Sequence, residues 1–274
     1  MPNASRACSP FPDRSLTGTM TVMHRIGLLV PSSNTTIETE VPALLRARER
    51  VRPEDTFTFH SARLRMEDVT PEALREMNEQ MERATTELAD LRPNVVATAC
   101  LVAIMAQGPG SHRAAQAEIE SILEREHVSA PVVSSAGALV DALHELGARK
   151  IGIVAPYLEE LTRLVVAYIE DAGIEVADAI SLDVPDNRAV AALDPHDLER
   201  HWRRLDLRGC DALVLSACVQ MRSLEVLDEV EHRSELPTVS AATATTWAAL
   251  RALDLEPIAP GAGALLRAAP ERVV

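Results

Sequence analysis

The chain carries the same series of short apolar segments twice, in the same order. The first series comprises RIGLLV (25–30), DTFTFHSARL (55–64), VVATACLVAIM (95–105) and PVVSSAGALVDAL (131–143). The second comprises KIGIVA (150–155), IEVADAISLD (174–183), LVLSACVQMRS (213–223) and PTVSAATATTWAAL (237–250). Four correspondences that keep their order indicate an internal duplication, with shorter loops in the second copy.

Each copy alternates strand patterns with helix patterns, which predicts parallel strands joined by helices. Aromatic residues make up only 3% of the chain, so its core must be built from Ala, Val, Leu and Ile, as buried parallel strands often are. The sequence therefore predicts an α/β fold of two similar lobes related by a pseudo-twofold axis. Each lobe is expected to hold a mostly parallel four-stranded sheet with helices on both faces.

One helix is predicted over residues 71–91, where apolar residues recur every three or four positions. Thr70 is its expected N-cap, with Pro71 at the first helical position. The predicted domains are a disordered extension over 1–23, a first lobe of 24–136 with 245–274, and a second lobe of 137–244.

Charge and targeting features narrow the class of protein. The formal net charge of −14 argues against nucleic acid or an anionic membrane as a partner. The sequence has no run of 18 apolar residues and no signal-peptide pattern at its start. Its four cysteines lack CxxC spacing, which predicts a reducing cytoplasmic setting with no disulfide framework and no metal site.

Candidate site residues follow the strands, because ligands of open parallel sheets bind beyond the carboxyl ends of the strands. Cys100 and Cys218 occupy equivalent positions in the two copies and are expected to face each other across the cleft between the lobes. Each is predicted to lie where a strand gives way to a helix, so that N–H groups and the helix dipole lower its pKa. A buried cysteine is often only a small core residue, but two at matched strand ends point to chemistry.

Other ligand classes receive little support from the sequence. The glycines at 108 and 110 follow the strand at a distance and lack the Lys-Ser/Thr of a phosphate loop, and no G-x-G-x-x-G follows any strand. No nucleotide or other cofactor is therefore expected. The histidines show no spacing typical of metal ligands.

The segments RIGLLVPSSNTTIETEVP (25–42), TACLVAIM (98–105) and SACVQM (216–221) resemble maleate cis-trans isomerase, of the aspartate/glutamate racemase superfamily. The resemblance covers residues 25–250 and implies a homodimer that acts on maleate, a small dicarboxylate, without a cofactor. It implies that Cys100 is the nucleophile and Cys218 a proton donor and acceptor. It further implies that the substrate carboxylates are held by Asn34, Tyr157 and Asn187 and by N–H groups at Leu101, Val102 and Val219.

The implied reaction is addition of a thiolate to the double bond, rotation about the resulting single bond and elimination to fumarate. Donors aimed at the developing enediolate should supply most of the rate enhancement, since one such donor is worth about 2.7–4 kcal/mol. Three alternatives remain open at this point. They are a two-cysteine racemase or epimerase, an arylmalonate-type decarboxylase that needs only a cysteine matching Cys218, and a small-acid-binding protein without catalysis.

Overall fold

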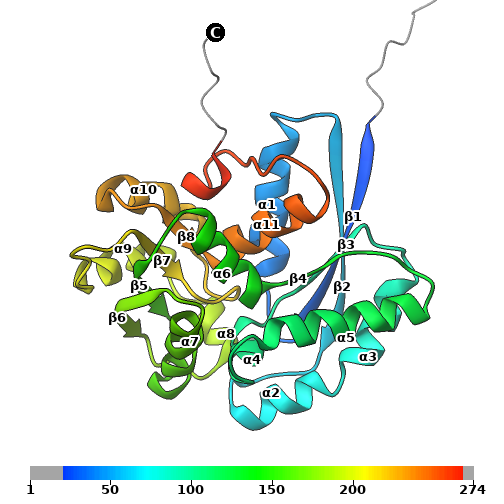
Figure 1. Cartoon of the computed structure of the whole chain (residues 1–274), viewed down its shortest axis with the longest axis horizontal. Coiled ribbons are helices and arrows are strands. Elements are labelled where there is room, and N and C mark those ends of the chain that lie inside the picture. The colour runs from blue at the N-terminus through cyan, green and yellow to red at the C-terminus, as the bar shows by residue number, and fades with distance from the viewer. Residues whose placement is uncertain (1–20, 268–274) are drawn as a thin grey trace, which may run out of the picture.

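The computed structural model describes residues 21–267, which form two four-stranded parallel sheets (Figure 1). The strands of the first sheet are β1 (Val22–Pro31), β2 (Asp55–Leu64), β3 (Val95–Thr98) and β4 (Val132–Ser134). Those of the second are β5 (Lys150–Ala155), β6 (Glu175–Ser181), β7 (Ala212–Ser216) and β8 (Thr238–Ser240). The strand orders are β2-β1-β3-β4 and β6-β5-β7-β8, so the two sheets share one topology and the predicted duplication is confirmed.

Helices connect the strands and cover the sheets. The α-helices are α1 (Ile37–Glu49), α2 (Pro71–Asn78), α3 (Met81–Ala89), α4 (Leu101–Met105), α5 (Ser111–Arg125), α6 (Ser135–Glu145), α7 (Glu159–Asp171), α8 (Asn187–Ala191), α9 (Leu198–His201), α10 (Leu224–Ser234) and α11 (Ala241–Ala252). Short 3-10 turns occupy Pro195–Asp197, Trp202–Arg204 and Ala264–Leu266. The predicted α/β class is thus confirmed.

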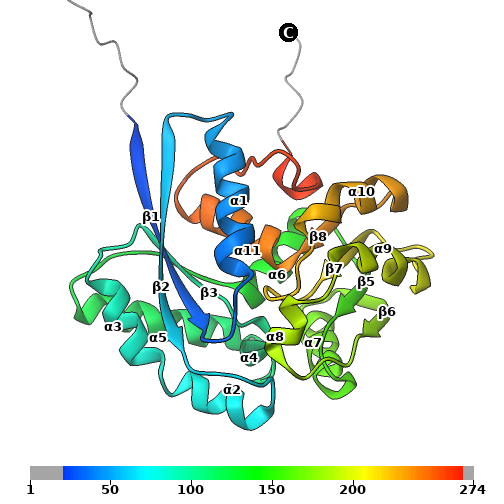
Figure 2. The same ribbon diagram turned by 180° about the vertical axis from the view of Figure 1, so that it is seen from behind.

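The junction between the two sheets is built mainly from helices of both halves of the chain. Helix α11 packs against α6 and α1, and α4 packs against α7. In Figures 1 and 2, α6 and α11 lie between the two sheets, while α4 and α8 lie together at one side of the junction. Helix α11 also contacts β3 and β4, so the second half of the chain returns to the first sheet. The predicted domains place residues 245–274 in the first lobe. That division at residues 136 and 244 stays a prediction.

The helix predicted over residues 71–91 is wrong in one respect, because the structure divides it into α2 and α3. The break lies at Gln80, whose side chain accepts from Arg65 N at 2.8 Å and donates to Arg65 O at 3.2 Å. Thr70 is the N-cap as predicted, and its hydroxyl accepts from Ala73 N. The helical pattern was correct, but a contact with a distant loop interrupts it.

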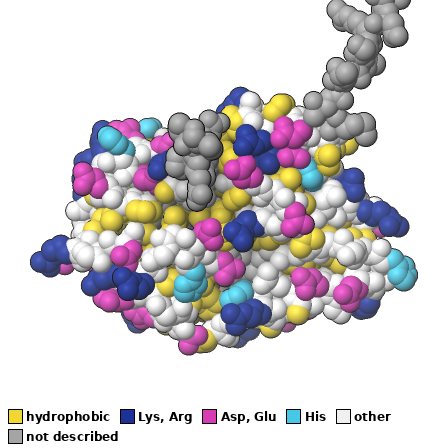
Figure 3. Space-filling view, turned by 45° about the horizontal axis from the view of Figure 1, so that its top comes forward, with side chains coloured by type: hydrophobic (Ala, Val, Ile, Leu, Met, Phe, Trp, Pro, Cys, Tyr) yellow, Lys and Arg dark blue, Asp and Glu magenta, His cyan; other side chains and the backbone are white. Residues whose placement is uncertain are grey.

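The first strand begins earlier than predicted, at Val22 rather than Arg25, because Val22 N bonds to Glu54 O and β1 pairs with β2 over its whole length. Most of the predicted disordered extension, residues 1–20, lies outside the described residues, as do 268–274. Within the described part of the chain, no helix has the length and apolar character needed to cross a bilayer. Acidic and basic side chains are interspersed on the face seen in Figure 3.

Candidate active site

The carboxyl ends of the central strands of both sheets open onto one small pocket. It is lined by Pro31, Asn34, Met66, Val69, Ala99, Cys100, Leu101, Val102, Tyr157, Asn187, Cys218, Val219 and Gln220. Every site residue predicted from the sequence lies in this set. The structure thus brings together, beyond the carboxyl ends of the strands, the residues that the sequence placed there.

Cys100 lies between β3 and α4, as its N-cap residue, and is partly exposed. The strand ends because Thr98 is the last residue to pair with β4. The N–H groups of Leu101 and Val102 lie in the first turn of α4, where a helix offers no internal partner for them. These two N–H groups, directly after Cys100 in the chain, are therefore available to an anion.

Cys218 follows β7 and is buried, with 7% of its surface exposed. The prediction that a helix begins directly after this cysteine is wrong, since α10 starts only at Leu224. The intervening residues form a turn in which Met221 N bonds to Cys218 O and Gln220 N lies 3.4 Å from the Cys218 sulfur. The two cysteines therefore have different surroundings despite their equivalent positions.

Tyr157 follows β5 and is buried beside Cys218. Its hydroxyl donates to the carbonyl oxygen of Ala217 at 3.1 Å. The same hydroxyl is close enough to the Cys218 thiol to lower its pKa, although the burial of that thiol raises the pKa by more. Burial also raises the pKa of the Tyr157 phenol well above its usual value, so the hydroxyl stays protonated and serves as a donor.

Asn34 is almost completely buried, and its two amide atoms have different functions. Its Oδ1 accepts from Thr36 N at 3.0 Å and from Ile37 N at 3.1 Å, which caps the start of α1. This fixes the orientation of the amide and leaves the Nδ2 group available to donate to a ligand. The bonds to Oδ1 alone would fit an asparagine that only forms a turn. The position of Asn34 in the pocket lining adds a free Nδ2 donor that can reach a ligand.

Asn187 is the first residue of α8 and reaches the first lobe through its side chain. Its Nδ2 donates to the Ser33 hydroxyl at 2.8 Å, which uses one of its two N–H groups. Asp186 caps α8 by accepting from Arg188 N and Ala189 N. Asn187 is thereby held at the rim between the lobes, opposite the loop that carries Asn34.

Main-chain N–H groups lower the pKa of both cysteines as predicted, but burial raises it by more, so the predicted net lowering is wrong. The pKa of the Cys100 thiol is raised to about 12, because burial raises it by more than the Ala103 N–H group lowers it, and the nearby Cys218 adds a smaller increase. Burial likewise raises the pKa of the Cys218 thiol, against the N–H groups of Gln220 and Met221. Desolvation outweighs the donors because the pocket is closed.

Five lining residues were not among the predicted site residues, and two of them, Met66 and Val69, also lie away from the strand ends that the sequence singled out. These two belong to the segment after β2, which is attached to both lobes. The Ser33 hydroxyl donates to Met66 O at 2.6 Å, Val69 N bonds to Pro185 O, and Asp68 forms a bridge with Asp186. The free volume of the pocket is about 20 Å³, enough for about one water molecule. A four-carbon diacid does not fit in this volume, so its binding requires the pocket to widen.

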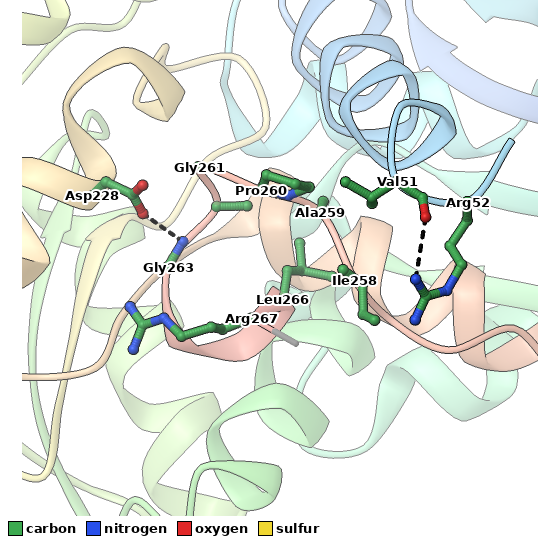
Figure 4. A pocket seen from close by; sticks show the side chains of 11 residues that line it. Val51, Arg52, Asp228, Ile258, Ala259, Pro260, Gly261, Gly263, Leu266 and Arg267 are labelled. Atoms are coloured by element: carbon green, nitrogen blue, oxygen red, sulfur yellow. Dashed lines mark hydrogen bonds between the residues drawn. The ribbon is translucent and has the colours of Figure 1, made fainter. Parts of the chain in front are cut away.

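In the described part of the chain, no group of three or more His, Cys, Asp and Glu side chains could hold a metal ion. A larger hollow of about 300 Å³ lies at the C-terminal loop, between Val51, Ile258 and Leu266 (Figure 4). Its lining is mostly apolar, with Arg52 and Arg267 at its edge and no cysteine.

Comparisons with known proteins agree on one family. Residues 26–266 match the family model described as arylmalonate decarboxylase. The chain is 53% identical to the maleate isomerase of Pseudomonas putida over 91% of its own length and 100% of that protein. It is 51% identical to the maleate isomerase of Geobacillus stearothermophilus, over 88% of this chain and 96% of the relative.

Solved structures give the same result. The maleate isomerase of Pseudomonas putida S16, in a cysteine-to-alanine variant with maleate, matches with a TM-score of 0.88 and 48% identity, over 89% of this chain and 98% of that one. A second match is a cysteine-to-serine variant of Nocardia farcinica maleate cis-trans isomerase, which holds a covalently bound succinylcysteine intermediate. Its TM-score is 0.87 and its identity 45%, over 90% of this chain and 99% of that one. The chain therefore belongs to the family described by the arylmalonate decarboxylase model and, within it, to the maleate isomerases.

Proposed function

We propose that this enzyme isomerises maleate to fumarate without a cofactor, through covalent addition of the Cys100 sulfur to the double bond. The observation that carries the proposal is the convergence of Cys100, Cys218 and the donor side chains of Asn34, Tyr157 and Asn187 on one pocket. The identity of about half of the residues to maleate isomerases over most of the chain supports the substrate.

The reaction begins when the Cys100 thiolate adds to one alkene carbon of maleate. The electron pair of the double bond moves toward the neighbouring carbon and its carboxylate, and the Cys218 thiol delivers a proton to that carbon. The product is a succinyl thioether, in which the former double bond is now single and can rotate. The Cys218 thiolate then removes a proton, the carbon–sulfur bond breaks, and fumarate leaves with the Cys100 thiolate regenerated.

The different surroundings of the two cysteines support this division of roles. Cys100 has the N–H groups of Leu101 and Val102 beside it at the start of α4, where they can stabilise charge that develops on the substrate. Val219 N–H can do the same from the other lobe. Cys218 has a phenolic hydroxyl and a main-chain N–H near its sulfur, which favour its thiolate after proton transfer. A succinylcysteine adduct in the Nocardia farcinica relative supports a protonated intermediate.

Closure of the pocket also has a role in this scheme. With both thiol pKa values raised by burial, the substrate-free enzyme holds its cysteines protonated at neutral pH. Admission of maleate requires the pocket to widen, which brings water to the sulfurs and eases ionisation. Closure then removes water while the adduct exists, so that it is not lost to side reactions.

The alternatives receive less support. An arylmalonate-type decarboxylase needs no cysteine at position 100, and the chain is only 24% identical to arylmalonate decarboxylase, over 48% of its length. A racemase would use the two cysteines on opposite faces of one tetrahedral carbon, without a covalent adduct. We further propose a cytoplasmic homodimer, the state implied by the resemblance and suited to reduced thiols. Sedimentation equilibrium and cell fractionation test these two points.

Proton NMR of the purified enzyme with maleate tests the function. We expect conversion to fumarate by the native enzyme and its loss in Cys100→Ser. If maleate stays unchanged while solvent deuterium enters the α-carbon of an amino or hydroxy diacid, the racemase replaces this proposal.

A further inference from the structure

Gln220 is the most densely bonded side chain of the pocket. Its Nε2 donates to Ser33 O at 3.0 Å and to Asn187 O at 2.8 Å. Its Oε1 accepts from Thr35 N at 2.9 Å and from Thr36 N at 3.3 Å. Only 1% of the residue is exposed, so these bonds replace water completely. A buried amide with all of its partners in place holds those partners in one arrangement.

Gln220 and its partners lie in three segments that carry proposed site residues. Ser33 and Thr35 flank Asn34 in the first lobe, Asn187 belongs to the second lobe, and Gln220 itself follows Cys218 by two positions. The Thr36 hydroxyl returns a bond to Gln220 O at 2.8 Å, and Gln220 N lies 3.4 Å from the Cys218 sulfur. One residue thus connects both asparagines and the second cysteine.

The amide of Gln220 is not a feature that the two halves of the duplicated fold share. The equivalent position in the first half, two residues after Cys100, is Val102, which lies in α4 and has no side-chain polar group. In the second half the helix is missing, and the turn after Cys218 is held by residues of the other lobe instead. Glu40 of α1 holds the far end of that turn, by accepting from Ser223 N and Leu224 N.

We propose that Gln220 is a positioning residue that fixes Asn34, Asn187 and the Cys218 turn relative to one another across the two lobes. This inference rests on the proposed isomerase function for its catalytic meaning. Without the amide, Ser33 O and Asn187 O lose their donors, and the N–H groups of Thr35 and Thr36 lose an acceptor. The two asparagines and the second thiol then no longer hold one fixed spacing, and a misplacement of this kind can reduce a rate by about 100-fold.

The test uses Gln220→Met, which keeps the length of the side chain and removes all four bonds, and Gln220→Glu, which keeps the acceptor and loses the donors. The matched control is Gln116→Met, since Gln116 donates one bond to Val132 O at 2.7 Å outside the site. Two readouts are taken well below the unfolding temperature of each variant. One is kcat and KM with maleate, and the other is the rate at which iodoacetamide labels Cys218, resolved by peptide mass spectrometry.

Cys210, which is also buried but lies before β7 and outside the pocket, reports general opening of the fold. For Gln220→Met we expect Cys218 to label at least fivefold faster with the Cys210 rate unchanged, and kcat/KM to fall by at least tenfold. Gln220→Glu should change in the same direction, and it carries the test if the Met variant does not fold. The Gln116→Met control should match the native enzyme in both readouts.

Three results would overturn the proposal. They are a Cys218 labelling rate that rises less than fivefold, an equal acceleration at Cys210, and faster labelling with kcat/KM kept within tenfold of native. A native enzyme that does not isomerise maleate would instead refute the proposed function, and the labelling comparison would still decide whether Gln220 holds the Cys218 turn.

Discussion

The hydroxyl of Tyr157 lies 3.1 Å from the carbonyl oxygen of Ala217, the residue that precedes Cys218. This contact joins the end of β5 to the end of β7 within the second lobe. It keeps a neutral phenol beside the sulfur that is proposed to move the proton. Removal of the Tyr157 hydroxyl therefore tests whether this group acts in the reaction or only stabilises the fold.

Tyr157→Phe removes only the hydroxyl and leaves the ring in place. We expect kcat to fall about 100-fold, since one lost donor to a developing charge costs about that much. Stability should fall by only about 1 kcal/mol, the usual contribution of a hydrogen bond. Steady-state kinetics and urea unfolding measure the two effects. A variant with native kcat would exclude the phenol from the reaction.

Asn34→Asp separates the two functions of the Asn34 amide. The carboxylate keeps the acceptor for Thr36 N and Ile37 N, and a negative charge at the start of α1 is favourable to the helix. It cannot donate, and it repels a dianion. We therefore expect an unchanged or higher unfolding temperature together with a loss of kcat/KM of at least about 100-fold, the cost of one lost donor. If kcat/KM stays near the native value, Asn34 does not hold a carboxylate.

The raised thiol pKa of the closed pocket predicts an unusual pH profile for alkylation of the substrate-free enzyme. With the pKa of Cys100 near 12, its labelling rate should still rise with pH above about 10, well beyond the usual range of a cysteine. Iodoacetamide labelling resolved by peptide measures this directly. A plateau near neutral pH would mean that donors at α4 outweigh burial, as the sequence first suggested.

Glu40 provides a second pH-dependent test, at the opposite end of the Cys218 turn. Burial raises the pKa of this carboxyl, although Leu224 N and Ser223 N lower it in part and Arg222 adds a smaller lowering. The folded state then binds the proton more tightly than the unfolded state. Its contribution to stability is present at low pH and is lost as pH rises from the unfolded pKa through the folded one.

Glu40→Gln keeps an acceptor for both N–H groups and cannot ionise. Urea unfolding of the two proteins between about pH 4 and pH 8 should show the variant gaining stability relative to the native protein as pH rises past the usual carboxyl pKa. Unfolding free energies that differ by the same amount throughout this range would show that Glu40 is not desolvated.

Much of the site followed from the sequence because a parallel sheet brings the carboxyl ends of its strands together. Cys100, Tyr157 and Cys218 each come directly after a strand, and a duplicated chain places two such sets against each other. The strand pattern therefore placed the two cysteines together, and the family resemblance added the three side chains expected to hold the substrate. Residues after a strand end are found in this way without knowledge of their contacts.

The remaining features depend on contacts between distant segments, which no local pattern encodes. Met66 and Val69 enter the pocket because their segment is bonded to Ser33 and Pro185. The break at Gln80 has the same kind of cause. The high pKa of Cys100 depends on how completely the pocket closes, which is a property of the packed structure.

The most direct test of the covalent mechanism is peptide mass spectrometry of Cys218→Ser after incubation with maleate. We expect a succinyl adduct on the peptide that contains Cys100, and none when Cys100 is also replaced by serine. The covalent mechanism would be contradicted if Cys100→Ser converted maleate to fumarate at the native rate, or if the adduct lay on another residue.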